Sequence, residues 1–243
     1  MLVTLLRSGL GPKEILFYGI IMLFALTLSF SFHEFMHAFV ADRLGDPTPR
    51  NMGRLTLNPL AHLDVVGTIL LLTAGFGWGK PVMYNPSRLN KFRSSRLMNI
   101  MVHLAGVTGN FILALLSGII STVITCLMAG RVDPESNAYI AISAIALAFS
   151  YTMDFSLMLL AFNLLPIPPL DGFHVLEELL PYRLKMTEGY RKFEMFAPYG
   201  ILVLFVLSYA TGISILSEAI KWIRMPFAIV INMVCGLIEQ LFT

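Results

Sequence analysis

Charged residues are scarce in this chain of 243 residues. Asp, Glu, Lys and Arg make up 13% of the sequence, whereas 56% of the residues are hydrophobic. Soluble domains carry about 25% charged residues, so the composition excludes an ordinary soluble domain. It predicts an all-α polytopic membrane protein, and the length favours a single domain over residues 1–243. The net charge of +2 gives no reason to expect a nucleic-acid partner.

Cysteine is equally scarce. Cys126 and Cys235 both lie in apolar runs, which excludes a disulfide framework and a cysteine-based zinc site. The chain also lacks internal repeats and any stretch long and polar enough to form a soluble domain. We expect no cleavable signal peptide, because the first apolar run is too long for one.

Long apolar runs are what the chain has instead. Runs that could span about 30 Å of hydrocarbon are Ile15–Val40, Leu97–Met128, Tyr139–Leu165 and Phe196–Ile220, with a marginal fifth at Met225–Phe242. We therefore expect four to five transmembrane helices. Val65–Phe76 is apolar but only about a dozen residues long, and it contains two glycines. This length favours a re-entrant segment over a full span.

Two short segments have the pattern of extended chain. In Gly53–Pro59, Leu55 and Leu57 alternate with polar residues, and Lys80–Pro86 is kept out of helix by its prolines. They predict a short membrane-associated β-hairpin, with ordinary connecting loops as an equally good alternative.

The basic residues predict an orientation. If Val65–Phe76 does not cross, twelve of the 17 Lys and Arg residues fall on one face of the membrane and five on the other. The positive-inside rule makes the first face cytoplasmic and places the N-terminus outside, as expected for a multi-pass protein of a bacterial-type cell membrane.

An H-E-x-x-H motif interrupts the first apolar run. His33 and His37 lie on one helix face, so both imidazoles can reach a single metal ion, and Glu34 between them can serve as a general base. Each ionisable group within a span costs roughly 2–3 kcal/mol on insertion. Three such groups in one run therefore indicate a functional site.

A third ligand is expected at the end of a later span. Catalytic zinc sites usually have three protein ligands. Asn163–Gly172 contains three prolines that break the helix, and such a break at membrane depth lines a cavity or is buried in protein. The predicted topology places Asp171 at a depth similar to that of the two histidines, so Asp171 is the expected third ligand.

These motifs resemble those of the site-2 protease family of intramembrane zinc metalloproteases. The resemblance implies one Zn2+ per chain, held by His33, His37 and Asp171, with Glu34 as the catalytic base. It also implies that Asn163 engages the substrate backbone, and Gly106–Asn110 is similar to the family's G-x-x-x-N signature. The stretch from Gly77 resembles short family members without PDZ or regulatory nucleotide-binding domains. The substrates would be transmembrane proteins or peptides in the lipid bilayer.

Other interpretations stay open at this point. The chain could be an intramembrane metal transporter, or a catalytically inactive membrane-protein binding module. Asn110 could be a further substrate contact and oxyanion donor, and both asparagines could instead be hydrogen-bonded between helices. Asp154 could pair with another helix. The remaining histidines, His62, His103 and His174, fit structural roles better than ligand roles.

Overall fold

A computed structural model describes residues 9–74, 77–211 and 215–242 of the chain. Within these ranges the protein is helical and has no named strand, which confirms the prediction of an all-α protein. The helices in chain order are α2 (Pro12–Arg43), α3 (Thr48–Asn51), α4 (Pro59–His62), α5 (Val65–Ala74), η1 (Pro86–Arg88), α6 (Ser95–Met128), α7 (Asn137–Asn163), α8 (Asp171–Leu179), α9 (Tyr182–Lys185), α10 (Glu188–Thr211) and α11 (Ile215–Gln240).

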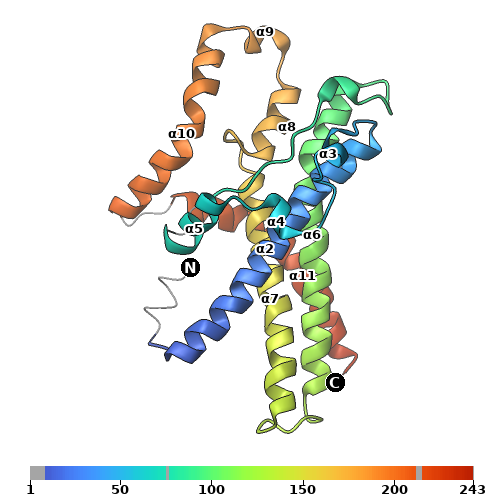
Figure 1. Ribbon diagram of the computed structural model, residues 1–243, viewed down its shortest axis with the longest axis vertical. Coiled ribbons are helices and arrows are strands. Elements are labelled where there is room, and N and C mark those ends of the chain that lie inside the picture. Colours follow the sequence, from blue (N-terminus) through green and yellow to red (C-terminus); the bar gives the residue numbers. More distant parts are fainter. Residues whose placement is uncertain (1–8, 75–76, 212–214, 243) are drawn as a thin grey trace.

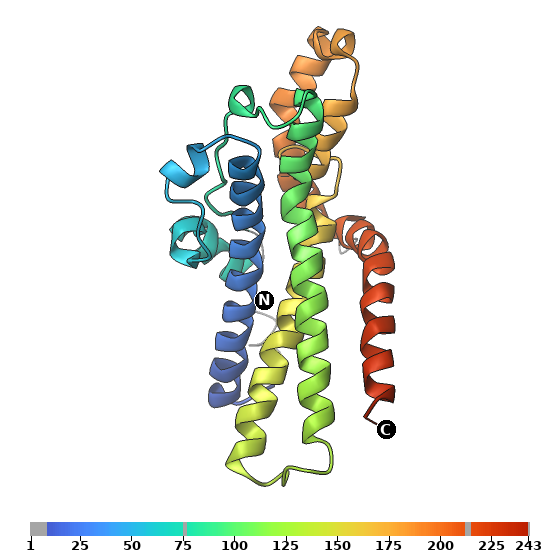
Figure 2. The ribbon, with the colours of Figure 1, turned by 90° about the vertical axis from the view of Figure 1, so that its right-hand side faces the viewer.

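Four of these helices, α2, α6, α7 and α11, are long and apolar enough to cross a membrane. Among the described elements, α6 and α7 share the most extensive contacts, and α2 packs against both. Figure 2 shows α2 and α11 on opposite sides of the α6–α7 pair. The first three predicted spans therefore lie where the sequence placed them, to within three residues.

The predicted span Phe196–Ile220 is wrong. The run is divided between α10, which ends at Thr211, and α11, which begins at Ile215. Hydropathy alone does not mark this boundary, because the residues on both sides of it are apolar, and residues 212–214 lie outside the described ranges. The marginal run Met225–Phe242 belongs to the longer α11, which accommodates Pro226 inside the helix.

The start of α11 lies beside the C-terminal end of α7. Leu216 shares a buried cluster with Leu165 and Leu170, whereas Ile231 packs near the middle of the bundle against Leu157. Lys221 and Arg224, in the first turns of α11, therefore lie at the same end of the bundle as Leu165, and not at the opposite end as the sequence topology assumed.

The predicted β-hairpin is also not formed. Pro59 begins α4, and the Asn58 side chain caps that helix by accepting a hydrogen bond from the Leu60 amide. The described part of Gly53–Pro59 pairs with no strand. One isolated antiparallel bridge joins Leu63 to Gly79. The segment from Lys80 onward stays extended without a partner strand, because Pro81 and Pro86 have no amide hydrogen to donate to a ladder.

The short apolar helix α5 has ten described residues. At 1.5 Å per residue it is about 15 Å long, which is half the thickness of a bilayer core. Gly75 and Phe76, at the end of the predicted re-entrant segment, lie outside the described residues. Figure 1 shows α5 beside α2, away from the α6–α7 pair.

Small residues and hydroxyl groups bring the central helices close together. A Cβ added to Gly109 of α6 would lie 2.4 Å from Cγ of Met36 on α2, so only glycine permits this approach. Between α2 and α7, the buried Ser156 hydroxyl donates to the Ser29 hydroxyl over 2.9 Å. Small residues and interhelical hydrogen bonds are the usual means of helix association in membranes.

Candidate metal centre

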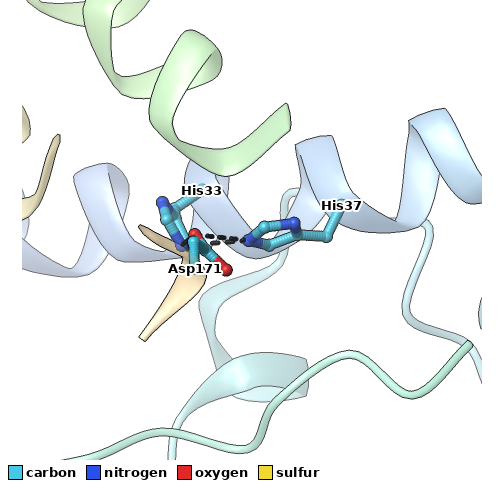
Figure 3. A group of neighbouring side chains, drawn as sticks. All are labelled: His33, His37 and Asp171. Carbon is cyan, nitrogen blue, oxygen red and sulfur yellow. Dashed lines mark hydrogen bonds and ion pairs between the residues drawn. The ribbon is translucent and has the colours of Figure 1, made fainter. Parts of the chain in front are cut away.

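Three side chains converge where α2 meets the start of α8. His33 Nε2 lies 3.2 Å and His37 Nε2 3.3 Å from Oδ2 of Asp171, and the two Nε2 atoms are 3.0 Å apart. Figure 3 shows both rings directed at the carboxylate. This is also the one group of three or more His, Cys, Asp or Glu side chains in the described residues that could hold a metal ion.

The spacing of these atoms fits zinc. With bonds of about 2.0–2.1 Å, a tetrahedral zinc site separates its ligand atoms by roughly 3.3 Å. Oδ2 of Asp171 is buried and has no well-oriented hydrogen bond among the described residues. A buried carboxylate oxygen without a hydrogen bond is costly unless it coordinates a cation. Three ligands of this kind leave the fourth position of a tetrahedral site for water or substrate.

Helix α6 holds both imidazoles in place. His37 Nδ1 lies 2.7 Å from the carbonyl oxygen of Val102, and His33 Nδ1 lies 3.2 Å from the amide nitrogen of Asn110. Gly106 sits between them, and a Cβ there would lie 2.4 Å from His37 Nε2 and 2.4 Å from His33 Cε1. The two rings therefore occupy the space that a side chain at position 106 would need.

Glu34 faces the extended segment that follows Gly79. Glu34 is 8% exposed, and its Oε2 accepts a hydrogen bond from the Val82 amide over 3.0 Å. Gly79 anchors this segment, since a Cβ there would fall 2.1 Å from the ring of Phe30. The segment thus crosses the metal-binding face of α2 at a fixed place.

The broken helix delivers Asp171 to the site. Helix α7 ends at Asn163 and α8 begins at Asp171, so the proline-rich segment between them interrupts the helix and places Asp171 beside His33 and His37 of α2. A Cβ on Gly172 would lie 2.3 Å from the carbonyl oxygen of Leu164, so this close turn requires glycine. The Asn163 amide donates to the Leu159 carbonyl of its own helix, and within the described residues no hydrogen bond joins it to the three converging side chains.

The other polar residues singled out in the sequence have partners elsewhere. His62 is fully buried and its Nε2 lies 2.8 Å from the Thr56 carbonyl oxygen. His103 stacks on His174, and its Nε2 lies 3.0 Å from the Tyr84 hydroxyl. Asp154 pairs with Arg224 of α11, as expected for an intramembrane carboxylate that meets another helix.

The sequence did not predict the backbone groups that hydrogen-bond to Glu34 and His37. The Val82 amide and the Val102 carbonyl carry no residue-specific signal, because every residue other than proline has both groups. A signal for Gly106 was present in the G-x-x-x-N pattern, but its contact with the two histidines was not predicted.

Comparison with known proteins decides the family. The chain is 38% identical over 188 residues to "Putative zinc metalloprotease YwhC" of Bacillus subtilis (strain 168), covering 76% of this chain and 78% of that protein. Residues 128–207, which include Asp171, match Peptidase family M50. The chain belongs to this family. It is a membrane zinc metalloprotease, and the resemblance to site-2 proteases is confirmed.

Two further relatives are mycobacterial. "Putative zinc metalloprotease Rip2" of Mycobacterium tuberculosis (strain ATCC 25618 / H37Rv) is 33% identical over 192 residues, covering 76% of this chain and 66% of that protein. The Rip2 protein of Mycolicibacterium smegmatis is 29% identical over 185 residues, and the chain spans 63% of its length. No solved structure matches the chain.

Proposed function

We propose that this M50 protease cleaves peptide bonds in or near transmembrane segments of membrane-protein substrates, with zinc held by His33, His37 and Asp171. The observation that carries the proposal is the convergence of these three ligand atoms within 4.8 Å. The histidines belong to α2, well inside a helix long enough to span. A peptide bond reaching them would therefore come from a segment within or next to the bilayer.

Glu34 is the general base of the proposed reaction. Bound zinc supplies Lewis-acid polarisation of a substrate carbonyl and lowers the pKa of water at the site toward ~7. Glu34 lies one residue from His33, and one of its oxygens is engaged by the Val82 amide. The other oxygen is left to accept the proton of the attacking water and to return it to the leaving amine. Asn163 is proposed to contact the substrate backbone.

The charge distribution supports a cytoplasmic active site. Placing Lys221 at the site end of the bundle raises the basic residues there from twelve to thirteen of 17, and Arg224 is left out because it pairs with Asp154 inside the bundle. Positive charge accumulates on the cytoplasmic side of membrane proteins. The metal centre then faces the cytoplasm and the N-terminus lies outside. The 15 Å helix α5 enters the bilayer from the same side without crossing it.

A cleavage assay with matched metal analysis tests the proposal. Purified protein in detergent is given a panel of single-span peptides, and zinc content is measured on the same samples. We expect Glu34→Gln to keep about one zinc per chain and to lose cleavage. Retention of zinc by the His33→Ala, His37→Ala and Asp171→Ala variants would refute the ligand set. Zinc uptake into proteoliposomes that survives Glu34→Gln, with no cleavage by the wild type, would favour transport instead.

A further inference from the structure

Asn110 of α6 contacts one of the proposed metal ligands. Its side chain is completely buried, with its amide nitrogen 3.2 Å from His33 Nδ1. The other atom of the same amide, Oδ1, is buried and has no hydrogen bond within the described part of the chain. A buried amide oxygen left unpaired costs about 1–3 kcal/mol, so this arrangement calls for an explanation.

The protonation that His33 needs as a metal ligand explains why an amide side chain is buried beside it. Nε2 of His33 faces Asp171 and His37, so Nε2 is the atom directed at the metal position. A neutral imidazole that uses Nε2 as a ligand carries its proton on Nδ1 and needs an acceptor there. Amide oxygen and nitrogen have nearly the same shape and exchange places by a half-turn. With Oδ1 turned toward Nδ1, the imidazole proton gains its acceptor, and the amide nitrogen takes the buried position without a partner. One amide atom is unpaired in either orientation, so the acceptor that His33 needs decides between them.

His37 already has the equivalent arrangement. Its Nδ1 lies 2.7 Å from the Val102 carbonyl oxygen, which can only accept a hydrogen bond. Val102, Gly106 and Asn110 are spaced by four residues and share one face of α6. This face offers a carbonyl to one imidazole, an amide to the other, and a glycine between them. Such outer partners fix the orientation of ligand histidines in metal sites.

We propose that Asn110 is a positioning residue for the zinc site, which accepts the Nδ1 proton of His33 through its amide oxygen, and not an oxyanion donor to the substrate. The proposal rests on the proposed ligand set. It assigns a distinct role to each asparagine, since the Asn163 amide bonds to its own helix and, in the described part of the chain, makes no hydrogen bond to either histidine.

Zinc affinity separates the two roles. Affinity is measured by competition with a chromophoric chelator for wild type and the Asn110→Ala, Asn110→Asp, Asn99→Ala and His33→Ala variants in detergent. We expect Asn110→Ala to weaken zinc binding about 10–100-fold. Asn110→Asp keeps an acceptor for the Nδ1 proton, and its affinity should stay within about threefold of wild type. Asn99→Ala is the matched control, because Asn99 is a buried amide of α6 that bonds to Glu178 and touches no ligand.

The outcomes decide the proposal. An Asn110→Ala variant that binds zinc like wild type but loses kcat would show an oxyanion donor and overturn it. A loss of zinc affinity well beyond threefold in Asn110→Asp would also overturn it, and this comparison with wild type remains informative if Asn110→Ala does not fold. Failure of the ligand set itself is separate, because His33→Ala would then retain zinc.

Discussion

The Val82 amide donates a hydrogen bond to Oε2 of Glu34 over 3.0 Å. This bond joins the proposed base on α2 to an extended segment 48 residues later in the chain. It leaves one carboxylate oxygen free and fixes the orientation of the other. The position of the base therefore depends on a backbone group that no side chain can replace.

Removal of this amide hydrogen should slow cleavage without removing zinc. Val82→Pro deletes the donor in a segment that is already extended and follows Pro81. Hydrogen bonds to charged groups contribute about 1.5–3 kcal/mol, so we expect kcat to fall roughly 10–100-fold. The matched control, Val82→Ala, trims the side chain and keeps the donor. A loss in Val82→Ala as large as that in Val82→Pro would show that packing, and not the hydrogen bond, matters.

Gly106→Ala should disrupt the metal centre directly. The added Cβ would lie 2.4 Å from His37 Nε2, so the ring or α6 must move away. We expect zinc content below half of the wild-type value and at least a tenfold loss of cleavage, because misplaced ligands no longer share one ion. Gly19→Ala, on α2, adds the same methyl group where nothing lies within 4 Å. Zinc content should not change in this control.

The convergence of His33, His37 and Asp171 was predictable because its geometry is local or strongly signalled. The spacing of His33 and His37 fixes their common face once a helix forms, and the prolines before Asp171 mark the break that turns the chain. The division between α10 and α11 was not predictable from hydropathy, since both sides of it are apolar. That error placed Lys221 and Arg224 at the wrong end of the bundle. The contacts of Val82 depend on the tertiary path alone.

Asp46 should make stability depend on acid pH. Its carboxylate is fully buried and accepts hydrogen bonds from the Thr48 amide and hydroxyl at 3.1 and 2.6 Å and from the Asn85 amide at 2.5 Å. Burial raises the pKa of Asp46, but these bonds outweigh it, so the pKa lies below its ordinary value. The ionised Asp46 therefore contributes to the free energy of unfolding above its ordinary, unfolded-state pKa of about 3.9. This contribution is lost as the pH falls through the lower pKa of the folded state.

The measurement is thermal unfolding in detergent between pH 2 and pH 7. We expect Asp46→Asn to have a lower melting temperature than wild type at pH 7. The difference between the two melting temperatures should become smaller as the pH falls below about 4. The Asp133→Asn variant is the control, because Asp133 lies in the loop between α6 and α7, away from the hydrogen bonds of Asp46. A difference between Asp46→Asn and wild type that stays constant over the whole range would contradict the assignment to this carboxylate.

The ion pair between Asp154 and Arg224 should hold α11 against α7. Both residues lie in helices long enough to span, where an unpaired charge is expensive. Asp154→Asn leaves Arg224 without its counter-charge, so we expect a loss of about 1–3 kcal/mol in the free energy of unfolding. Reversing both charges, with Asp154→Arg and Arg224→Asp together, should recover most of it. The single variants Asp154→Arg and Arg224→Asp are measured beside the double variant. If the loss in the double variant equals the sum of the two single losses, the pair contributes no coupling and α11 is held by apolar contacts such as that of Ile231 with Leu157.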